Sequence, residues 1–208
     1  MKISFKICVL ALTSCLLTQS CAKVFYSPDA KEKAKEQSVL AILPPSITIS
    51  SIVKTDPGTV KEVQRSESLN FQKEIYAWLL KRQMKMQFNC EFQEPHNTNA
   101  ILKKAGYPEK PLTTEEICDL LRVDGLIKTN FGLSKPLSVE GAVLAIALFS
   151  AGAPSNIVQI NYTISDCISK KLIFSYDRSL VGGFSSIYTL VDKAMKQISK
   201  KMPHYKNQ

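Results

Sequence analysis

Residues 158–176 read VQINYTISDCISKKLIFSY, and this stretch predicts a two-stranded antiparallel hairpin. Apolar and polar side chains alternate in both halves, and a period of two places the apolar ones on one face of a sheet. The other face is then exposed to water. Residues 166–171 between the halves form the turn. The apolar positions are Val158, Ile160, Tyr162 and Ile164 in the first half and Leu172, Phe174 and Tyr176 in the second.

A predicted helix follows the hairpin and begins at Ser185 or Ser186, after a break at Gly182 and Gly183. Its apolar residues recur at 3.6-residue spacing and form one stripe. These residues are Ile187, Leu190, Val191, Ala194 and Ile198. The lysines near its carboxyl end complement the negative end of the helix dipole. They are Lys196, Lys200 and Lys201.

Upstream of the hairpin, strand patterns and helix patterns take turns. The predicted order begins with a buried strand at 38–52 that bends at Pro44–Pro45, a loop at 54–65 and a helix at 68–86. A strand at 88–92 and a short helix at 98–105 follow. The next helix begins with the capping-box pair Thr113 and Glu116, and a strand at 123–133 comes after it. We therefore expect the α/β (α+β) class, with a single mixed β-sheet flanked by helices and a carboxyl-terminal hairpin and helix. Residues 38–205 form one domain in this interpretation, and 206–208 form a tail.

The first 21 residues have the layout of a secretory signal peptide that ends at a lipidation site. Lys2 and Lys6 precede a short apolar run, which ends at LTQSC, residues 17–21. We therefore expect residues 1–20 to be cleaved and Cys21 to be lipidated, as in a bacterial lipobox. Cys15, after Leu12-Thr13-Ser14, fits the lipobox pattern better but leaves too short an apolar run. A buried amino-terminal helix with incidental cysteines is the remaining alternative.

Composition limits the function classes. A hydrophobic fraction of 45% and a charged fraction of 22% exclude a fully disordered chain. Removal of residues 1–20 leaves 188 residues, and the loss of two lysines lowers the formal charge from +9 to +7. The lysines follow no nucleic-acid motif, so we expect a solvated surface with some attraction to anionic lipid and no nucleic-acid partner. Residues 22–37 read as a polar tether.

The remaining cysteines and histidines indicate no metal site, because they lack paired short spacings. Cys90, Cys118 and Cys167 permit one disulfide with one free thiol, or three free thiols, and the sequence leaves their pairing open. A nucleophilic pair of Cys90 with His96, a predicted loop residue, is the catalytic alternative. His204 lies near the carboxyl terminus, where we expect it to be solvated.

Residues 141–149, GAVLAIALF, are the most hydrophobic stretch after the leader. A run of this length is usually a buried core helix. It has no polar face, however, and connects two predicted strands, so it is equally a candidate contact surface. The side chains that would make contact with a partner or with membrane are Val143, Leu144, Ile146, Leu148 and Phe149.

Several short patterns resemble a group of bacterial envelope lipoproteins. They are VLAILPPS at 39–46, KKAG at 103–106, TEEICDLLRVDGLI at 114–127, KKLIFSYD at 170–177 and SKKMPHY at 199–205. The group includes the curli secretion channel lipoprotein, the penicillin-binding-protein activator lipoproteins and small Bacteroidetes-type lipoproteins. Its members share a domain similar to the amino-terminal domain of the Tol translocation protein. This chain departs from them in lacking long amphipathic pore strands and a long disordered tether.

The resemblance implies a non-catalytic scaffold or partner-binding module on the outer membrane, facing the periplasm, with no cofactor beyond the lipid on Cys21. Its partner would be an envelope protein or a second copy of the chain, and no small-molecule substrate is inferred. Two alternatives stay open. One is an oligomeric secretion channel, and the other is a small thiol-dependent periplasmic enzyme.

Overall fold

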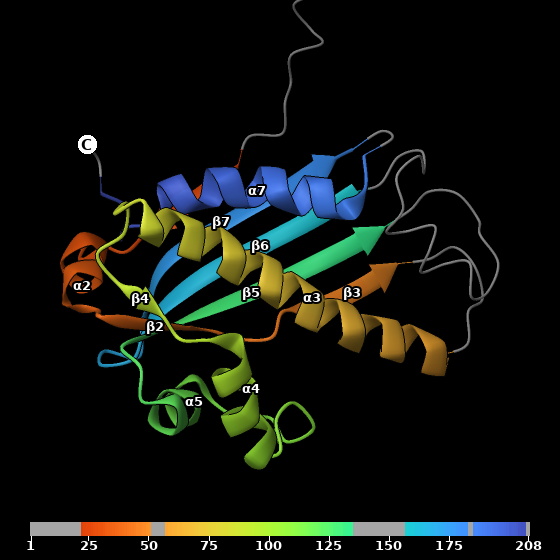
Figure 1. The fold of residues 1–208 in the computed structure, drawn as a ribbon, viewed down its shortest axis with the longest axis horizontal. Helices are drawn as coiled ribbons and strands as arrows, with labels where there is room; N and C mark the ends of the chain where they lie inside the picture. Colours follow the sequence, from red (N-terminus) through yellow and green to blue (C-terminus); the bar gives the residue numbers. More distant parts are fainter. Residues whose placement is uncertain (1–21, 51–56, 135–156, 183–184, 207–208) are drawn as a thin grey trace, which may run out of the picture.

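The computed structural model describes residues 22–50, 57–134, 157–182 and 185–206 (Figure 1). The strands form one mixed sheet in the order β1-β7-β6-β5-β2-β4, and β3 pairs with β5 as well. They are β1 (Lys23–Tyr26), β2 (Val39–Ile42), β3 (Ser46–Ser50), β4 (Glu91–Phe92), β5 (Gly125–Ser134), β6 (Ile157–Asp166) and β7 (Leu172–Val181). The helices are α2 (Ala30–Glu36), α3 (Pro57–Met84), α4 (Pro95–Lys104), α5 (Thr114–Leu121) and α7 (Ile187–Lys201). The predicted fold class is confirmed.

The predicted hairpin and the predicted interruption at Pro44–Pro45 are both present in the sheet. β6 and β7 pair antiparallel, with Tyr162 opposite Tyr176. β2 and β3 both run parallel to β5, where Leu40 pairs with Gly125 and Ile47 with Phe131. The prolines at 44 and 45 therefore divide one long strand into two segments that continue along the same neighbour, because proline cannot donate a ladder hydrogen bond.

Helices lie on both faces of the sheet. α3 and α7 lie side by side on one face (Figure 1), and α4 and α5 pack against part of the other. The larger hydrophobic cluster lies under α3 and α7. It includes Phe71 of α3, whose ring centroid lies 4.7 Å from that of Phe131. Neighbouring residues of one strand point to opposite faces. Accordingly Leu126 belongs to a second cluster, under α4 and α5. Within the described ranges, no helix is both long enough and apolar enough to cross a membrane.

The predicted polar tether at 22–37 is wrong. Residues 23–26 form β1, which pairs antiparallel with β7 and places Val24 opposite Tyr176. Residues 30–36 form α2, which buries Ala30 and Ala34. The lysines and glutamates at the end of this segment indicate either a helical turn or a spacer. The structure has the helix, whose two alanines lie on one face and pack against the domain. The domain therefore begins before residue 38.

Two further predictions are corrected. The predicted loop at 54–65 lies partly in α3, which is helical from Pro57 onward. Proline is favoured in the first turn of a helix, because the missing N–H has no partner there anyway. Leu172, predicted to point inward, is 41% exposed. The ladder shifts register between Ile164 and Ser165, which exposes Leu172 and buries Ile173 in its place.

Candidate functional site

The residues with the strongest predicted roles lie outside the described residues. Cys21, the predicted lipidation site, is the residue before the first described one. The predicted contact residues Val143, Leu144, Ile146, Leu148 and Phe149 fall in 135–156, between β5 and β6. Their roles stay predictions.

The two members of the alternative catalytic pair occupy different environments. Cys90 is buried, and burial raises the pKa of its thiol to about 12. Only the thiolate is a good nucleophile, so this side chain is protonated and unreactive at neutral pH. His96 lies on the exposed surface of α4 rather than in the predicted loop.

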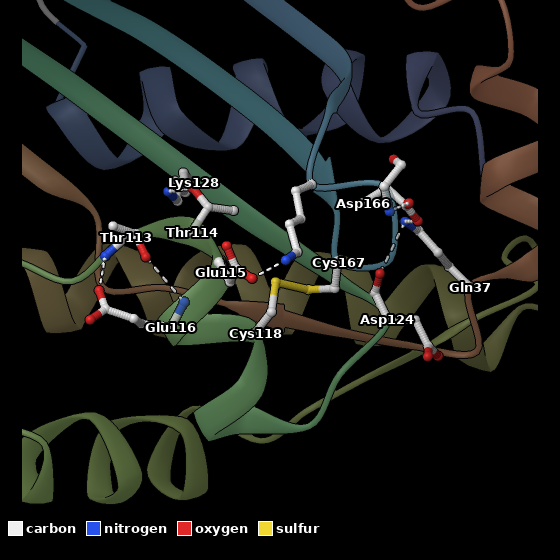
Figure 2. Close-up of a disulfide and its surroundings, with 12 residues drawn as sticks. Gln37, Thr113, Thr114, Glu115, Glu116, Cys118, Asp124, Lys128, Asp166 and Cys167 are labelled. Atoms are coloured by element: carbon white, nitrogen blue, oxygen red, sulfur yellow. Dashed lines mark hydrogen bonds and ion pairs between the residues drawn. A yellow bond between two sulfur atoms is a disulfide. The ribbon is translucent and has the colours of Figure 1, made fainter.

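Cys118 and Cys167 form a disulfide, which settles the pairing that the sequence left open (Figure 2). Their Cα atoms are 5.6 Å apart, and 49 positions of sequence separate them. The bond joins α5 to the turn between β6 and β7. In that turn the Lys170 ammonium forms an ion pair with the Glu115 carboxylate of α5. The free cysteine among the described residues is Cys90.

Hydrogen bonds around this disulfide fix the amino-terminal segment to the rest of the domain (Figure 2). The Gln37 amide donates to Asp166 Oδ1 at 2.8 Å, and Asp124 Oδ2 accepts the Ser38 N–H at 2.8 Å. His204 Nε2 lies 2.7 Å from Gln37 Oε1. Three distant parts of the chain therefore meet at Gln37: the segment before β2, the β6–β7 turn and the carboxyl-terminal segment.

His204 is buried, and its predicted solvated position is wrong. Its Nε2 must carry the proton, because the Gln37 oxygen that it faces can only accept. Its Nδ1 has no hydrogen-bond partner among the described residues. Loss of solvent disfavours a charged ring, so burial lowers the pKa of His204 to about 4.

A groove of about 710 Å³ lies between α7 and the β1–β7 edge of the sheet, and it is lined by apolar and positively charged side chains. We call it the cationic groove. Its apolar residues are Ala22, Val24, Tyr176 and Leu180, and its polar ones are Arg178, Lys193, Lys196, Gln197, Lys200 and Lys201. It therefore combines an apolar wall with five cationic side chains, and no carboxylate lines it.

The sheet and α7 position the groove from both sides. Val24 pairs with Tyr176 across the β1–β7 ladder. At the carboxyl end of α7, the Tyr26 hydroxyl donates to the Lys201 carbonyl at 2.6 Å. The Tyr176 hydroxyl donates to Gln197 Oε1 at 3.1 Å. These bonds connect the strand, the helix and the groove wall, so the cationic side chains extend from a rigid base.

Within the described ranges, no carboxylate forms an ion pair with the cationic side chains of the groove. The ion pairs among the described residues, Lys33 with Glu36 and Lys170 with Glu115, both lie elsewhere. Arg178 donates to the Gln197 side chain, while its buried Nε has no partner among the described residues. The groove offers donors and positive charge but no thiol, carboxylate or imidazole among its lining residues. Its chemistry is suited to binding an anion.

Sequence reasoning missed the groove because its residues come from three separate segments. The lysines of α7 were interpreted only as partners of the helix dipole. Arg178 and Val24 carried no signal, since their positions depend on the pairing of β1 with β7.

Comparison with known proteins identifies no family, because no family model and no curated protein match the chain. It is similar to a PelC dodecamer from Paraburkholderia phytofirmans, with 7% identity and a TM-score of 0.45 over 91% of this chain and 100% of that one. Lipoprotein GNA1162 from Neisseria meningitidis has 10% identity and a TM-score of 0.46, over 79% and 96% of the two chains. The LpoB C-terminal domain from Salmonella enterica has 10% identity and a TM-score of 0.33, over 74% and 95%. With TM-scores below 0.5, these similarities assign no function.

Proposed function

We propose that this chain is a non-catalytic cell-envelope lipoprotein, anchored through acyl chains on Cys21. In this proposal it acts as a scaffold or partner-binding module with a Tol-like domain, on the periplasmic side of the outer membrane. The observation that carries the proposal is the order of the first 26 residues. A charged start, a short apolar run and the sequence LTQSC at 17–21 lead directly into β1, the first strand of the domain.

The Cys118–Cys167 disulfide supports export. Structural disulfides persist in oxidising compartments such as the bacterial periplasm and are rare in the cytosol. This bond closes a long loop between two elements of the core, which is typical of a structural bridge. The chemistry of the domain therefore agrees with a leader that directs it out of the cytoplasm.

The proposal of a non-catalytic role draws support from Cys90. The raised pKa of its thiol disfavours the thiolate form, and a cysteine-dependent enzyme needs the thiolate as its nucleophile. The thiol also lies in the hydrophobic cluster under α3 and α7. A Cys90→Ser variant is expected to keep full biological activity, and loss of activity in a correctly folded variant would favour the thiol enzyme.

Lipidation is tested by mass spectrometry of the amino-terminal peptide from membrane-extracted protein. We expect the mature chain to begin at Cys21 and to carry acyl chains. Cys21→Ser should abolish the modification and release the protein from the membrane fraction. Cys15→Ser is the matched control, because it removes the other lipobox cysteine and should leave both results unchanged. An unmodified Cys21 in the wild-type protein would contradict the proposal.

The function also needs a contact surface, which we propose to be the hydrophobic stretch at 141–149. Its length and lack of a polar face fit a segment that packs against a partner in the envelope or against a second copy.

A further inference from the structure

We propose that the cationic groove rests on the phosphate headgroups of the membrane that holds the anchor. This contact depends on the proposed lipidation of Cys21, and it gives the domain a fixed orientation relative to the membrane. The domain would not hang from a tether. It would lie against the bilayer with the β1 edge and the carboxyl half of α7 facing the lipid.

The first step is the distance between anchor and groove. Ala22 lines the groove, and Cα atoms of adjacent residues are about 3.8 Å apart. An acylated Cys21 would therefore lie within one residue of the groove. The chain after it has no slack, because β1 is hydrogen-bonded to β7 from Lys23 onward. The membrane surface must then be close to this part of the domain.

The second step is charge. Five cationic side chains line the groove, and none of them forms an ion pair with another described residue. Bacterial membranes and their envelope surfaces expose anionic phosphate groups, and these attract Lys and Arg within a Debye length. A surface that cancels the groove's charge is thus present wherever the anchor holds the chain.

The third step is the mixture of apolar and cationic lining. The flexible stems of Lys193, Lys196 and Lys200 can lie along apolar surface while their ammonium groups reach outward. The apolar residues Val24 and Leu180 are only partly buried, though they pack against the core. Such an amphipathic lining suits the boundary between headgroups and acyl chains better than a fully hydrated partner.

The experiment compares lysine acetylation in the full-length acylated protein after reconstitution into two kinds of vesicle. One kind is phosphatidylcholine alone, and the other contains phosphatidylglycerol as well. An uncharged acetylating reagent and peptide mass spectrometry report the labelling rate of each lysine. We expect the groove lysines to be labelled roughly fivefold more slowly in the anionic vesicles. The attraction of one surface lysine to an anionic bilayer strengthens binding by about this factor. Lys73, Lys103 and Lys104, on α3 and α4, should be labelled equally in both.

Two charge-reversal variants provide the matched test. Lys200→Glu with Lys201→Glu changes the last turn of α7, and Lys103→Glu with Lys104→Glu changes the last turn of α4 by the same charge. The first pair should abolish protection of Lys193 and Lys196, and the second should not. High salt, at which the Debye length falls to about 3 Å, should also abolish it.

Equal labelling of the groove lysines in both vesicles would overturn the proposal, and so would equal loss of protection in the two variants. The first result would mean that anionic headgroups do not occupy the groove. The mass of the amino-terminal peptide is read from the same samples. It reports the anchor independently, so failure of lipidation and failure of the groove contact are distinguished.

Discussion

At the scale of single residues, His204 makes folding depend on pH. Its pKa is about 4 in the folded protein against an ordinary value of 6.5. Between these values the unfolded chain binds a proton that the folded chain does not. Stability is therefore complete above pH 6.5, falls as the pH drops, and has lost up to about 3 kcal/mol near pH 4.

This prediction is measured by urea unfolding between pH 7 and pH 5. We expect the unfolding free energy to fall by about 1 kcal/mol for each pH unit below 6.5. A His204→Gln variant should lose this dependence, whatever its absolute stability. His96→Gln is the control, because that histidine is exposed on α4, and it should keep the wild-type slope. The pKa values of Asp166 and Glu116 are both lowered, so these carboxyls titrate below the window. Burial raises the pKa of Asp166, but its hydrogen bonds to Ser169 and Gln37 together outweigh this, and the Thr113 N–H lowers the pKa of Glu116.

The sequence could not have indicated the burial of His204. A histidine between proline and tyrosine near a basic carboxyl terminus has the composition of a solvated tail. Its burial depends on Gln37, which is 167 positions away and reaches it only after β2 and the β6–β7 turn are in place. Burial of Cys90 was easier to foresee, because it lies in an alternating segment next to β4.

At the scale of elements, the Cys118–Cys167 disulfide holds α5 against the β6–β7 turn. It closes a loop with a sequence separation of 49, and restricting such a loop in the unfolded chain stabilises the fold by about 4 kcal/mol. Dithiothreitol should lower the unfolding free energy by roughly that amount. The ion pair of Lys170 with Glu115 is exposed and contributes little by comparison.

The control for this prediction is a Cys118→Ala, Cys167→Ala double variant. It should have the stability of the reduced wild-type protein and should not respond to dithiothreitol. Calorimetry or denaturant unfolding gives the comparison. Equal stability of oxidised and reduced wild-type protein would show that the bridge does not constrain the unfolded chain.

Elements with a strong local signal were predictable, and those that depend on distant partners were not. The capping box of Thr113 and Glu116 forms as predicted at the start of α5, with both hydrogen bonds present. The stripe of α7 is buried as predicted. In contrast, β1 is only four residues long, and three of its side chains are exposed. Its existence follows from the free edge of β7, which no local pattern reveals.

At the scale of the whole molecule, the exposed apolar side chains of the described residues bear on how copies could assemble. Large obligate interfaces are usually hydrophobic and continuous. The most exposed apolar side chains of the described surface are instead dispersed. Met84 and Met86 lie at the end of α3, Ile168 in the β6–β7 turn, and Val181 at the opposite end of that hairpin. The polar face of the sheet carries a chain of hydrogen bonds from Asn130 through Asn161 to Asp177.

This distribution predicts a small native mass. Full-length protein extracted in mild detergent should be a monomer or dimer once bound detergent is subtracted, because the four most exposed apolar side chains of the described surface lie in three separate places. Any association should then depend on the hydrophobic stretch at 141–149. Leu144→Asp with Phe149→Asp is expected to abolish partner binding or dimerisation while circular dichroism and thermal unfolding stay unchanged. A discrete high-order oligomer that survives both substitutions would contradict the scaffold proposal and favour the secretion channel.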